Sequence, residues 1–315
     1  MKKTALMFAG QGAQYVGMGK DLVENYPSAK AWFNQAEQIL GFDIAKICFE
    51  GPEAELTKTE YCQPAIFLVS WIALQLLKER IPNLAVQGAT AGLSLGELTA
   101  LTAAGAFTFE DGLKTARQRG RFMQEACNQT RGGMAALVGL AEAPTREVCA
   151  AAGVEVANLN CPGQIVISGE ADKIIKACEL AKAKGAKRAI PLPVAGAYHS
   201  RLMCSAQAKV KVMLDSTNMR TPQVPVISNV TALPHRSPTE IKARLVEQVS
   251  ASVRWEQSVR YLLGQGFNQF IELGPGTALS GFLKRIDKNT SVYNVADVPS
   301  LENAVKALTT ETASN

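Results

Sequence analysis

Short apolar runs and longer amphipathic stretches alternate along most of the chain. Residues 4–10 and 85–92 are short, mostly apolar runs and predict buried strands, because a strand covered on both faces carries apolar residues on both. Residues 28–40, 63–79 and 95–104 have the apolar spacing of helices. Strands that alternate with helices in this way indicate an α/β fold with a mostly parallel sheet.

A further long helix is expected to begin after Thr108. Thr108 and Asp111 form a start similar to a capping box, and Gly105 lies where it would end the preceding helix. A stripe of small and apolar side chains then follows at helical spacing: Phe109, Leu113, Ala116, Gly120, Met123 and Cys127.

Residues 132–198 show a different order of apolar and amphipathic segments, which predicts the β-α-β-β-α-β order of a ferredoxin-like split unit. The expected strands are 133–140, 154–160, 164–169 and 187–194, and the expected helices are 143–153 and 171–186. We therefore expect residues 131–198 to form a small ferredoxin-like subdomain. It would be inserted into a large α/β subdomain made of residues 1–130 and 199–315.

The large subdomain is expected to resume after this insertion. Its expected helices are 208–216, 239–249 and 258–266, its expected strands are 224–230 and 269–276 with a turn at the end of the second, and residues 309–315 are expected to be a loose tail.

Composition limits the classes of partner. With 47% hydrophobic and 19% charged residues, the chain can bury a large core. The net charge of +5 is mild, and no run of lysine and arginine with interleaved aromatic residues predicts a nucleic-acid partner. Residues 65–77 are apolar but short, so we expect a core helix and no membrane partner. The apolar run after Lys2 and Lys3 reaches only Ala9, which is short for a signal peptide.

Cysteine usage points to a reducing compartment. The seven cysteines are an odd number and include no C-x-x-C pair, so a disulfide framework or a zinc site is not expected. Buried free thiols in the cytoplasm are the preferred interpretation.

One serine lies between two glycines where a predicted strand ends and a predicted helix begins: Gly92-Leu93-Ser94-Leu95-Gly96. This is the nucleophile-elbow pattern of hydrolase-like α/β folds, in which small flanking residues permit a tight turn that exposes the serine hydroxyl. The N–H of Leu95, at the start of the helix, is a candidate donor to an oxyanion. The five-residue pattern alone also occurs by chance, and its place between strand and helix favours catalysis.

A serine hydroxyl needs a base to become a nucleophile, and the chain has only two histidines. His235 lies between two prolines and is expected in a surface loop. His199 directly follows a predicted strand, and we therefore predict that His199 is the base. No carboxylate stands out as a third member, so a main-chain or amide carbonyl is expected to orient the imidazole.

Residues 10–14, "GQGAQ", suggest a phosphate-binding loop but do not fit one. Tyr15 stands where the third glycine of a dinucleotide fingerprint belongs, and Met18 stands where a P-loop has lysine. Two interpretations stay open from the residues alone. Gln11 supplies a second oxyanion donor, or the segment is a plain tight turn.

Several stretches coincide, in order, with the motifs of one family. They are "FAGQGAQ", "GLSLGEL", "RQRGRFMQ", "NLNCPGQIVISG", "KRAIPLPVAGAYHS", "VPVISNV" and "IELGPGTALSGFLKRI". Over about residues 4–310, the chain resembles the malonyl-CoA:acyl carrier protein transacylases of fatty acid synthesis and the related acyltransferase domains of polyketide synthases. The small subdomain of that family matches the expected insertion.

The resemblance assigns catalytic roles. It implies that Ser94 accepts the acyl group, that His199 is its base, and that Gln11 and Leu95 are the oxyanion donors. It also implies that the carbonyl of Gln248 orients the histidine.

The resemblance assigns selectivity roles as well. It implies that Arg119 pairs with the malonyl carboxylate and that Gln63 and Asn160 lie near the site. Tyr198, a bulky residue before the base, is similar to its counterpart in malonyl-selective members, where it crowds the space of an α-methyl group. Leu93 departs from the histidine that is usual there, which bears on the pocket and on substrate preference but not on the base.

The implied activity is ping-pong transfer of a malonyl group from coenzyme A to the phosphopantetheine thiol of an acyl carrier protein, through a seryl acyl-enzyme. Malonyl-CoA is then a substrate, no cofactor or metal is bound, and the enzyme is a cytoplasmic monomer. The alternatives are a serine thioesterase or esterase, a trans-acting polyketide acyltransferase that uses another extender unit, and a scaffold protein without activity. Whether the pathway makes fatty acids or polyketides stays open.

Overall fold

The computed structural model describes residues 2–82 and 88–313. Four parallel strands form the central sheet of the larger part, in the order β2-β1-β7-β8. These strands are β1 (Thr4–Phe8), β2 (Ala89–Gly92), β7 (Gln269–Leu273) and β8 (Ser291–Val295). Alternate residues of β1 and β7 face opposite sides, so both faces of the sheet carry apolar side chains and must be covered.

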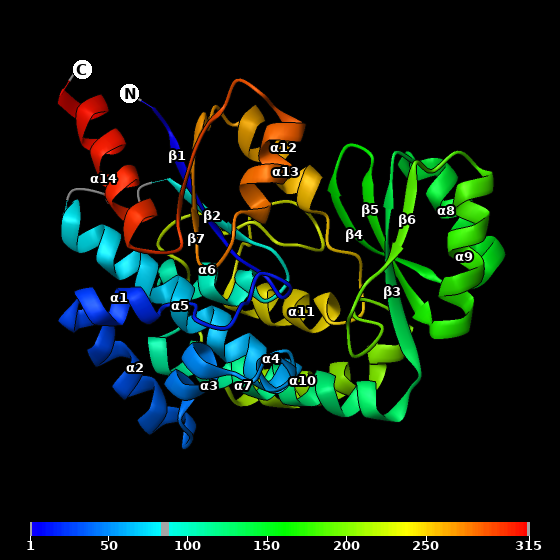
Figure 1. Ribbon diagram of the computed structural model, residues 1–315, viewed down its shortest axis with the longest axis horizontal. Helices are drawn as coiled ribbons and strands as arrows, with labels where there is room; N and C mark the ends of the chain where they lie inside the picture. The colour runs from blue at the N-terminus through cyan, green and yellow to red at the C-terminus, as the bar shows by residue number, and fades with distance from the viewer. Residues whose placement is uncertain (1, 83–87, 314–315) are drawn as a thin grey trace.

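Helices cover the two faces of this sheet (Figure 1). Leu6 and Phe8 pack into a core with α5 (Thr59–Arg80) and α7 (Phe109–Gln129). Ala5 and Met7 pack on the other side against residues of α12 and α13. The remaining helices are α1 (Lys20–Asn25), α2 (Pro27–Leu40), α3 (Ile44–Glu50), α4 (Glu53–Leu56), α6 (Gly96–Ala103), α10 (Cys204–Ser216), α11 (Pro238–Gln248), α12 (Trp255–Gly264), α13 (Ala278–Ile286) and α14 (Val298–Ala313), with a short 3₁₀ turn at Arg201–Met203.

Helix α5 is the central helix of the larger core. By length and composition alone, Thr59–Arg80 passes as a membrane span, but 78% of its most apolar window is buried inside the protein. It packs against α7, α2 and α6. The prediction that residues 65–77 belong to a core helix is confirmed.

The second sheet is antiparallel and lies to one side of the molecule (Figure 1). Its strands are β3 (Gly132–Val138), β4 (Glu155–Cys161), β5 (Gln164–Glu170) and β6 (Arg188–Pro191), in the order β4-β5-β3-β6. Helices α8 (Glu142–Ala152) and α9 (Ala171–Ala183) pack on it through a separate core. This is the strand order of the ferredoxin-like unit. The expected fold class is confirmed, and the subdomain boundaries at 130/131 and 198/199 stay a prediction.

The structure corrects some expected elements. Residues 224–230 form no continuous strand, and only Val226 and Ile227 make isolated bridges, to Thr90 and Pro234. The expected loose tail is helical through Ala313, because α14 continues across it. Part of the strand expected at 85–92 lies outside the described residues, which resume at 88.

The cysteines match the expectation in part. All seven are free, and six of them are buried. Cys204, at the start of α10, is exposed.

Candidate active site

The turn between β2 and α6 has the geometry of a nucleophile elbow. Ser94 has φ of 53°, a left-handed conformation that is strained for a residue with a side chain. A Cβ on Gly92 would come within 2.0 Å of Gly96, and a Cβ on Gly96 would come within 2.2 Å of the Phe8 carbonyl oxygen. Both glycines are therefore required for the strand and the helix to approach closely enough to raise the serine.

The imidazole of His199 faces this serine. Ser94 Oγ and His199 Nε2 lie 2.8 Å apart, and His199 Nδ1 lies 2.8 Å from the main-chain oxygen of Gln248. Because a carbonyl only accepts, Nδ1 carries the proton and Nε2 presents its lone pair to the serine hydroxyl. His199 also has a left-handed φ, of 58°.

The carbonyl that orients His199 comes from the end of a helix. Gln248 is the last residue of α11, where the final carbonyls lack partners within the helix. One of these oxygens is therefore free to accept from the imidazole, and the negative end of the helix dipole faces the ring. The structure thus brings together Ser94, His199 and Gln248, whose side chains or carbonyls were predicted to act together.

Burial lowers the pKa of His199 to about 4, and the nearby charge of Arg119 adds to this effect. The hydrogen bond to Gln248 opposes both. His199 is therefore neutral at neutral pH, which is the form that a general base needs.

Arg119 lies beside the serine, on the inner face of α7, and is 2% exposed. Its Nη1 donates to Gln63 Oε1 at 2.8 Å, and its Nη2 donates to Gln248 Oε1 at 2.8 Å and to Ser94 Oγ at 3.2 Å. Burial lowers the pKa of Arg119 to about 10, which leaves the guanidinium charged at neutral pH. Arg117, two residues earlier, instead pairs with Glu60 at 3.0 Å and stacks over Phe42.

The two predicted oxyanion donors flank the serine. Leu95 directly precedes the first residue of α6, and Gln11 follows β1 in the adjacent loop. Within residues 2–82 and 88–313, neither main-chain N–H donates to another protein group. A free N–H at a helix start beside a nucleophile is suited to a developing negative charge.

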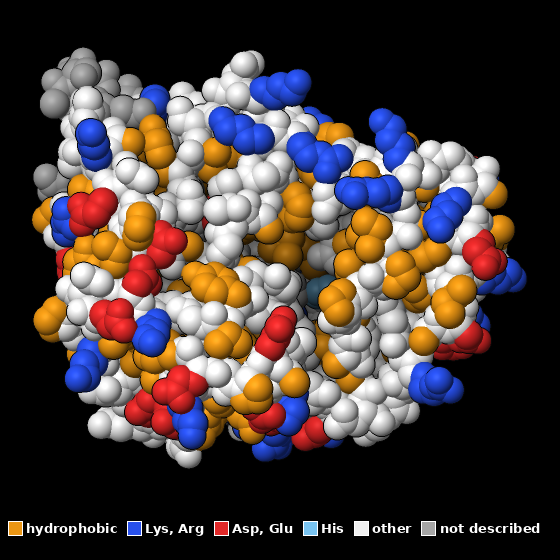
Figure 2. Space-filling view, viewed as in Figure 1, with side chains coloured by type: hydrophobic (Ala, Val, Ile, Leu, Met, Phe, Trp, Pro, Cys, Tyr) orange, Lys and Arg blue, Asp and Glu red, His pale blue; other side chains and the backbone are white. Residues whose placement is uncertain are grey.

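A cleft of about 830 Å³ opens above the serine, between the two sheets. Figure 2 shows this hollow with hydrophobic side chains in it and with lysine and arginine side chains along one rim. The lining includes Ser94, His199, Gln11, Tyr198 and Asn160, and also the apolar side chains of Met134, Leu192, Val194 and Phe282. An apolar wall with a few polar groups at its base is typical of a small-molecule site.

Of the three residues predicted near the site, Asn160 and Tyr198 line this cleft, and Gln63 contacts Arg119. Gln63 anchors the guanidinium of Arg119, as above, and is 1% exposed. Asn160 comes from β4 and lines the side of the antiparallel sheet. The Tyr198 hydroxyl forms a hydrogen bond with Thr59, and burial raises the pKa of this phenol.

His235 lies in a loop as expected, but its side chain does not face the surface. Its side chain is fully buried, and its Nε2–H donates to Glu97 Oε1 at 2.8 Å. The flanking prolines suggested a surface loop, but the buried carboxylate of Glu97 holds the imidazole inside.

Sequence reasoning missed Asn229 and Glu97. Asn229 Oδ1 accepts from the Ser94 main-chain N–H at 2.6 Å, and its Nδ2 donates to the Gly92 carbonyl at 2.7 Å, so it holds the elbow from behind. Glu97 follows the elbow directly and is 0% exposed. A charged residue inside the otherwise uncharged run after Ser94 was the one signal in the sequence for Glu97.

Among the described residues, no group of three or more histidine, cysteine, aspartate or glutamate side chains is placed to hold a metal ion. The polar groups that line the cleft include a hydroxyl, an imidazole and amides, and a buried guanidinium contacts the hydroxyl. This set is suited to acyl transfer through serine.

Comparisons with known proteins agree with this chemistry. Residues 6–313 match the family model described as "Acyl transferase domain". The malonyl CoA-acyl carrier protein transacylase of Bacillus subtilis is 43% identical over 318 residues, which cover 99% of each chain.

Solved structures show the same likeness. The malonyl CoA-acyl carrier protein transacylase of Clostridium perfringens superposes with a TM-score of 0.93 at 40% identity, over 99% of this chain and 100% of that one. A malonyl-transacylase solved in complex with its type II PKS acyl-carrier protein gives a TM-score of 0.93 at 36% identity, over 97% and 99% of the two chains. The chain thus belongs to the acyl transferase domain family, among the malonyl CoA-acyl carrier protein transacylases.

Proposed function

We propose that this protein transfers a malonyl group from coenzyme A to the phosphopantetheine thiol of an acyl carrier protein, through an acyl-enzyme on Ser94. The observation that carries the proposal is that a base and a buried cation both lie beside the Ser94 hydroxyl. The Ser94 hydroxyl lies 2.8 Å from the base nitrogen of His199 and 3.2 Å from the guanidinium of Arg119. A nucleophile with its base and a buried cation beside it fits an acyl group that carries its own carboxylate.

In the first half-reaction, His199 Nε2 takes the proton of Ser94 Oγ while Oγ attacks the thioester carbonyl. A new C–O bond forms, and the carbonyl electrons move to an oxyanion near the N–H groups of Leu95 and Gln11. When the C–S bond breaks, His199 returns the proton to sulfur, and coenzyme A leaves as a thiol. An oxyanion donor of this kind is typically worth about 3 kcal/mol of barrier.

The second half-reaction runs these steps in reverse with another thiol. His199 deprotonates the phosphopantetheine thiol, whose sulfur attacks the seryl ester and forms the C–S bond to the carrier protein. The bond between Ser94 Oγ and the acyl carbon then breaks, and His199 returns the proton to Oγ. A thiol is a good leaving group, and a thioester is an activated electrophile. An imidazole oriented by the Gln248 carbonyl therefore suffices, and no carboxylate is needed as a third catalytic group.

Arg119 and Tyr198 support selectivity for malonyl. The buried guanidinium would pair with the free carboxylate of the acyl group, and the phenol of Tyr198 narrows the cleft where an α-methyl group would lie. Leu93 lines the same cleft in place of a histidine and adds apolar surface.

This chemistry needs no cofactor, and malonyl-CoA enters as a substrate. We place the enzyme in the cytoplasm, since its free cysteines are suited to a reducing compartment.

Intact mass spectrometry tests the proposal. After mixing with malonyl-CoA, the protein is expected to gain the mass of one malonyl group, on Ser94 by peptide mapping, and to lose it to added holo acyl carrier protein. The Ser94→Ala variant is expected to gain nothing. Faster loss of malonyl to water than to the carrier protein would instead indicate a thioesterase.

The pH profile of malonyl loading tests the state of His199. The imidazole acts as a base only when neutral, so kcat/KM is retained above its folded-state pKa and falls as pH drops through it. Because that pKa is about 4, kcat/KM is expected to stay level down to about pH 5. A fall centred near the ordinary histidine value of about 6.5 would contradict this assignment.

A further inference from the structure

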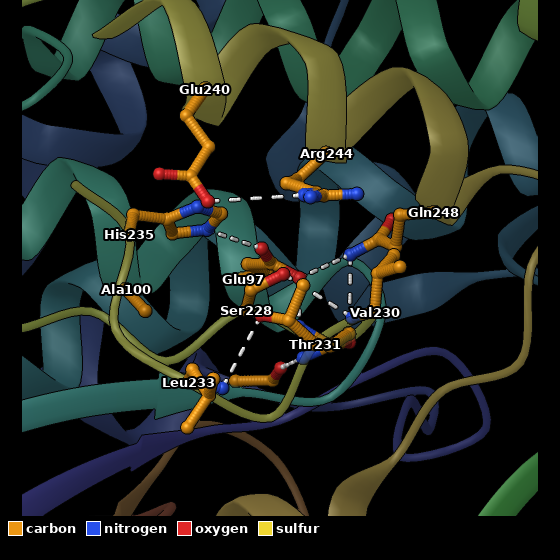
Figure 3. A network of polar contacts seen from close by, with 12 residues as sticks. Glu97, Ala100, Ser228, Val230, Thr231, Leu233, His235, Glu240, Arg244 and Gln248 are labelled. Atoms are coloured by element: carbon orange, nitrogen blue, oxygen red, sulfur yellow. Dashed lines mark hydrogen bonds and ion pairs between the residues drawn. The ribbon is translucent and has the colours of Figure 1, made fainter. Parts of the chain in front are cut away.

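A buried carboxylate lies behind the nucleophile elbow, outside the cleft. Glu97, the second residue of α6, is 0% exposed. Its Oε1 accepts from His235 Nε2–H at 2.8 Å, and its Oε2 accepts from the Asn229 main-chain N–H at 3.0 Å and from Gln248 Nε2–H at 2.7 Å. Figure 3 shows Glu97 between His235 and Gln248. None of the steps above uses this carboxylate.

The carboxylate is the nearest acceptor of the Gln248 amide, whose Nε2–H group also donates to the Ser94 main-chain oxygen at 3.0 Å. A carboxylate only accepts hydrogen bonds, so the amide must turn its NH₂ group towards Glu97. The amide oxygen then faces the other way and accepts from Arg119 Nη2 at 2.8 Å. A flipped amide would set its NH₂ group against the guanidinium, two donors face to face, and its oxygen against the Glu97 carboxylate, two acceptors face to face.

The two halves of Gln248 serve different partners. Its main-chain oxygen orients His199, and its side-chain oxygen holds Arg119. A change at Glu97 acts first on the side-chain amide, and therefore on the guanidinium. The bond to His199 comes from the backbone at the end of α11 and does not depend on the amide orientation.

The same arrangement balances the charge of Arg119 without a direct ion pair. In the described part of the chain Arg119 forms no direct ion pair, and its Nε has no partner. Glu97 provides a negative charge one amide away. The Nε–H group is thus a donor that no described protein group uses and from which a carboxylate carried by the substrate would accept.

We propose that Glu97, held in place by His235, is a positioning residue for acyl selectivity, because it orients the Gln248 amide that holds Arg119. This inference rests on the proposed function. It predicts that Glu97 affects the preference for malonyl over neutral acyl groups more than it affects acyl transfer itself.

The test compares loading of malonyl-CoA and acetyl-CoA by the parent, Glu97→Ala and Glu97→Gln enzymes. In Glu97→Ala the amide loses the nearest of its acceptors and keeps weaker ones, among them the Ser94 main-chain oxygen at 3.0 Å. The malonyl-to-acetyl ratio of kcat/KM is therefore expected to fall about tenfold. In Glu97→Gln the new side-chain oxygen accepts from Gln248 and Asn229 as before, so most of the ratio is expected to return. The NH₂ group then faces His235, which accepts by changing its tautomer.

Thr102→Ala is the matched control. Thr102 lies on the same helix and is 3% exposed, and its hydroxyl donates to the Leu98 carbonyl of that helix at 2.8 Å. Its loss removes a buried polar group on α6 and is expected to leave the ratio unchanged. If Glu97→Ala does not fold, His235→Leu releases the carboxylate from one side and is expected to lower the ratio about threefold.

An unchanged ratio in folded Glu97→Ala or in His235→Leu would overturn the inference, as would equal ratios for Glu97→Ala and Glu97→Gln. Failure of the proposed function looks different. The parent enzyme itself would then not load malonyl from malonyl-CoA, whatever the variants do.

Discussion

Replacing His199 with alanine is expected to slow the loading of Ser94 from malonyl-CoA by about 10³-fold. His199 Nε2 lies 2.8 Å from Ser94 Oγ. Among the described residues, the one other side chain in hydrogen-bond contact with that hydroxyl is Arg119, a cation that cannot accept a proton. Without the imidazole, the hydroxyl has no group to accept its proton. Rapid-quench measurement of the acyl-enzyme gives the rate directly, under single-turnover conditions.

The Ser94→Ala enzyme gives the background rate of this measurement. The His199→Ala enzyme is expected to load malonyl slowly, but faster than that background, because the N–H groups of Leu95 and Gln11 remain to stabilise the oxyanion. Loading at the parent rate would show that another group removes the proton. A large loss of thermal stability would be a separate effect, and the melting temperature of each variant therefore accompanies its rate.

Replacing Arg119 with alanine is expected to lower kcat/KM for malonyl-CoA by about 10²-fold to 10³-fold, while loading from acetyl-CoA is kept or rises. In the parent, an acetyl group would leave the buried guanidinium without a carboxylate partner. The variant removes both the attraction for malonyl and the penalty against neutral acyl groups. Competition between the two thioesters, read by mass spectrometry of the acyl-enzyme, measures the change.

Arg119→Lys is the matched variant for geometry. Lysine keeps the positive charge but has no planar fork, so it cannot hold Gln63, Gln248 and a carboxylate together. Its malonyl preference is expected to fall between those of the parent and Arg119→Ala. If Arg119→Ala loads malonyl as well as the parent does, the guanidinium has no part in binding the carboxylate.

Residues with a strong local pattern were predictable from sequence. The glycines around Ser94 are required by contacts of 2.0 to 2.2 Å that any side chain would make, and such steric demands leave a clear trace in the sequence. Thr108 caps α7 as expected, because its hydroxyl accepts from the Asp111 N–H. His199 could be chosen because the chain holds only one other histidine.

Other parts of the site depend on contacts between distant segments. Arg119 and Arg117 look alike on a helical wheel, and only packing against α5 and α11 buries the first and leaves the second beside Glu60. The Gln248 carbonyl acts because its helix ends there, and no residue type marks that. For both residues the family resemblance supplied the expectation, and periodicity did not.

Weak local patterns also explain the misses in the fold. Strand β8 is only partly buried along most of its length, so it lacks the apolar run that marked β1. Residues 224–230 have the composition of a strand, but the chain turns after Ile227 to place Asn229 behind the elbow. Tertiary contacts override local preference there.

The left-handed backbone at Ser94 and His199 sets a stability–activity trade-off at the centre of the molecule. Conformations of this kind cost about 1 to 3 kcal/mol each, and a residue without a Cβ would avoid that cost. The substitutions that would most readily make the fold more robust at these two positions are therefore the ones that remove the nucleophile and its base. A search for thermostable variants of this enzyme should leave both turns untouched and look for its gains elsewhere.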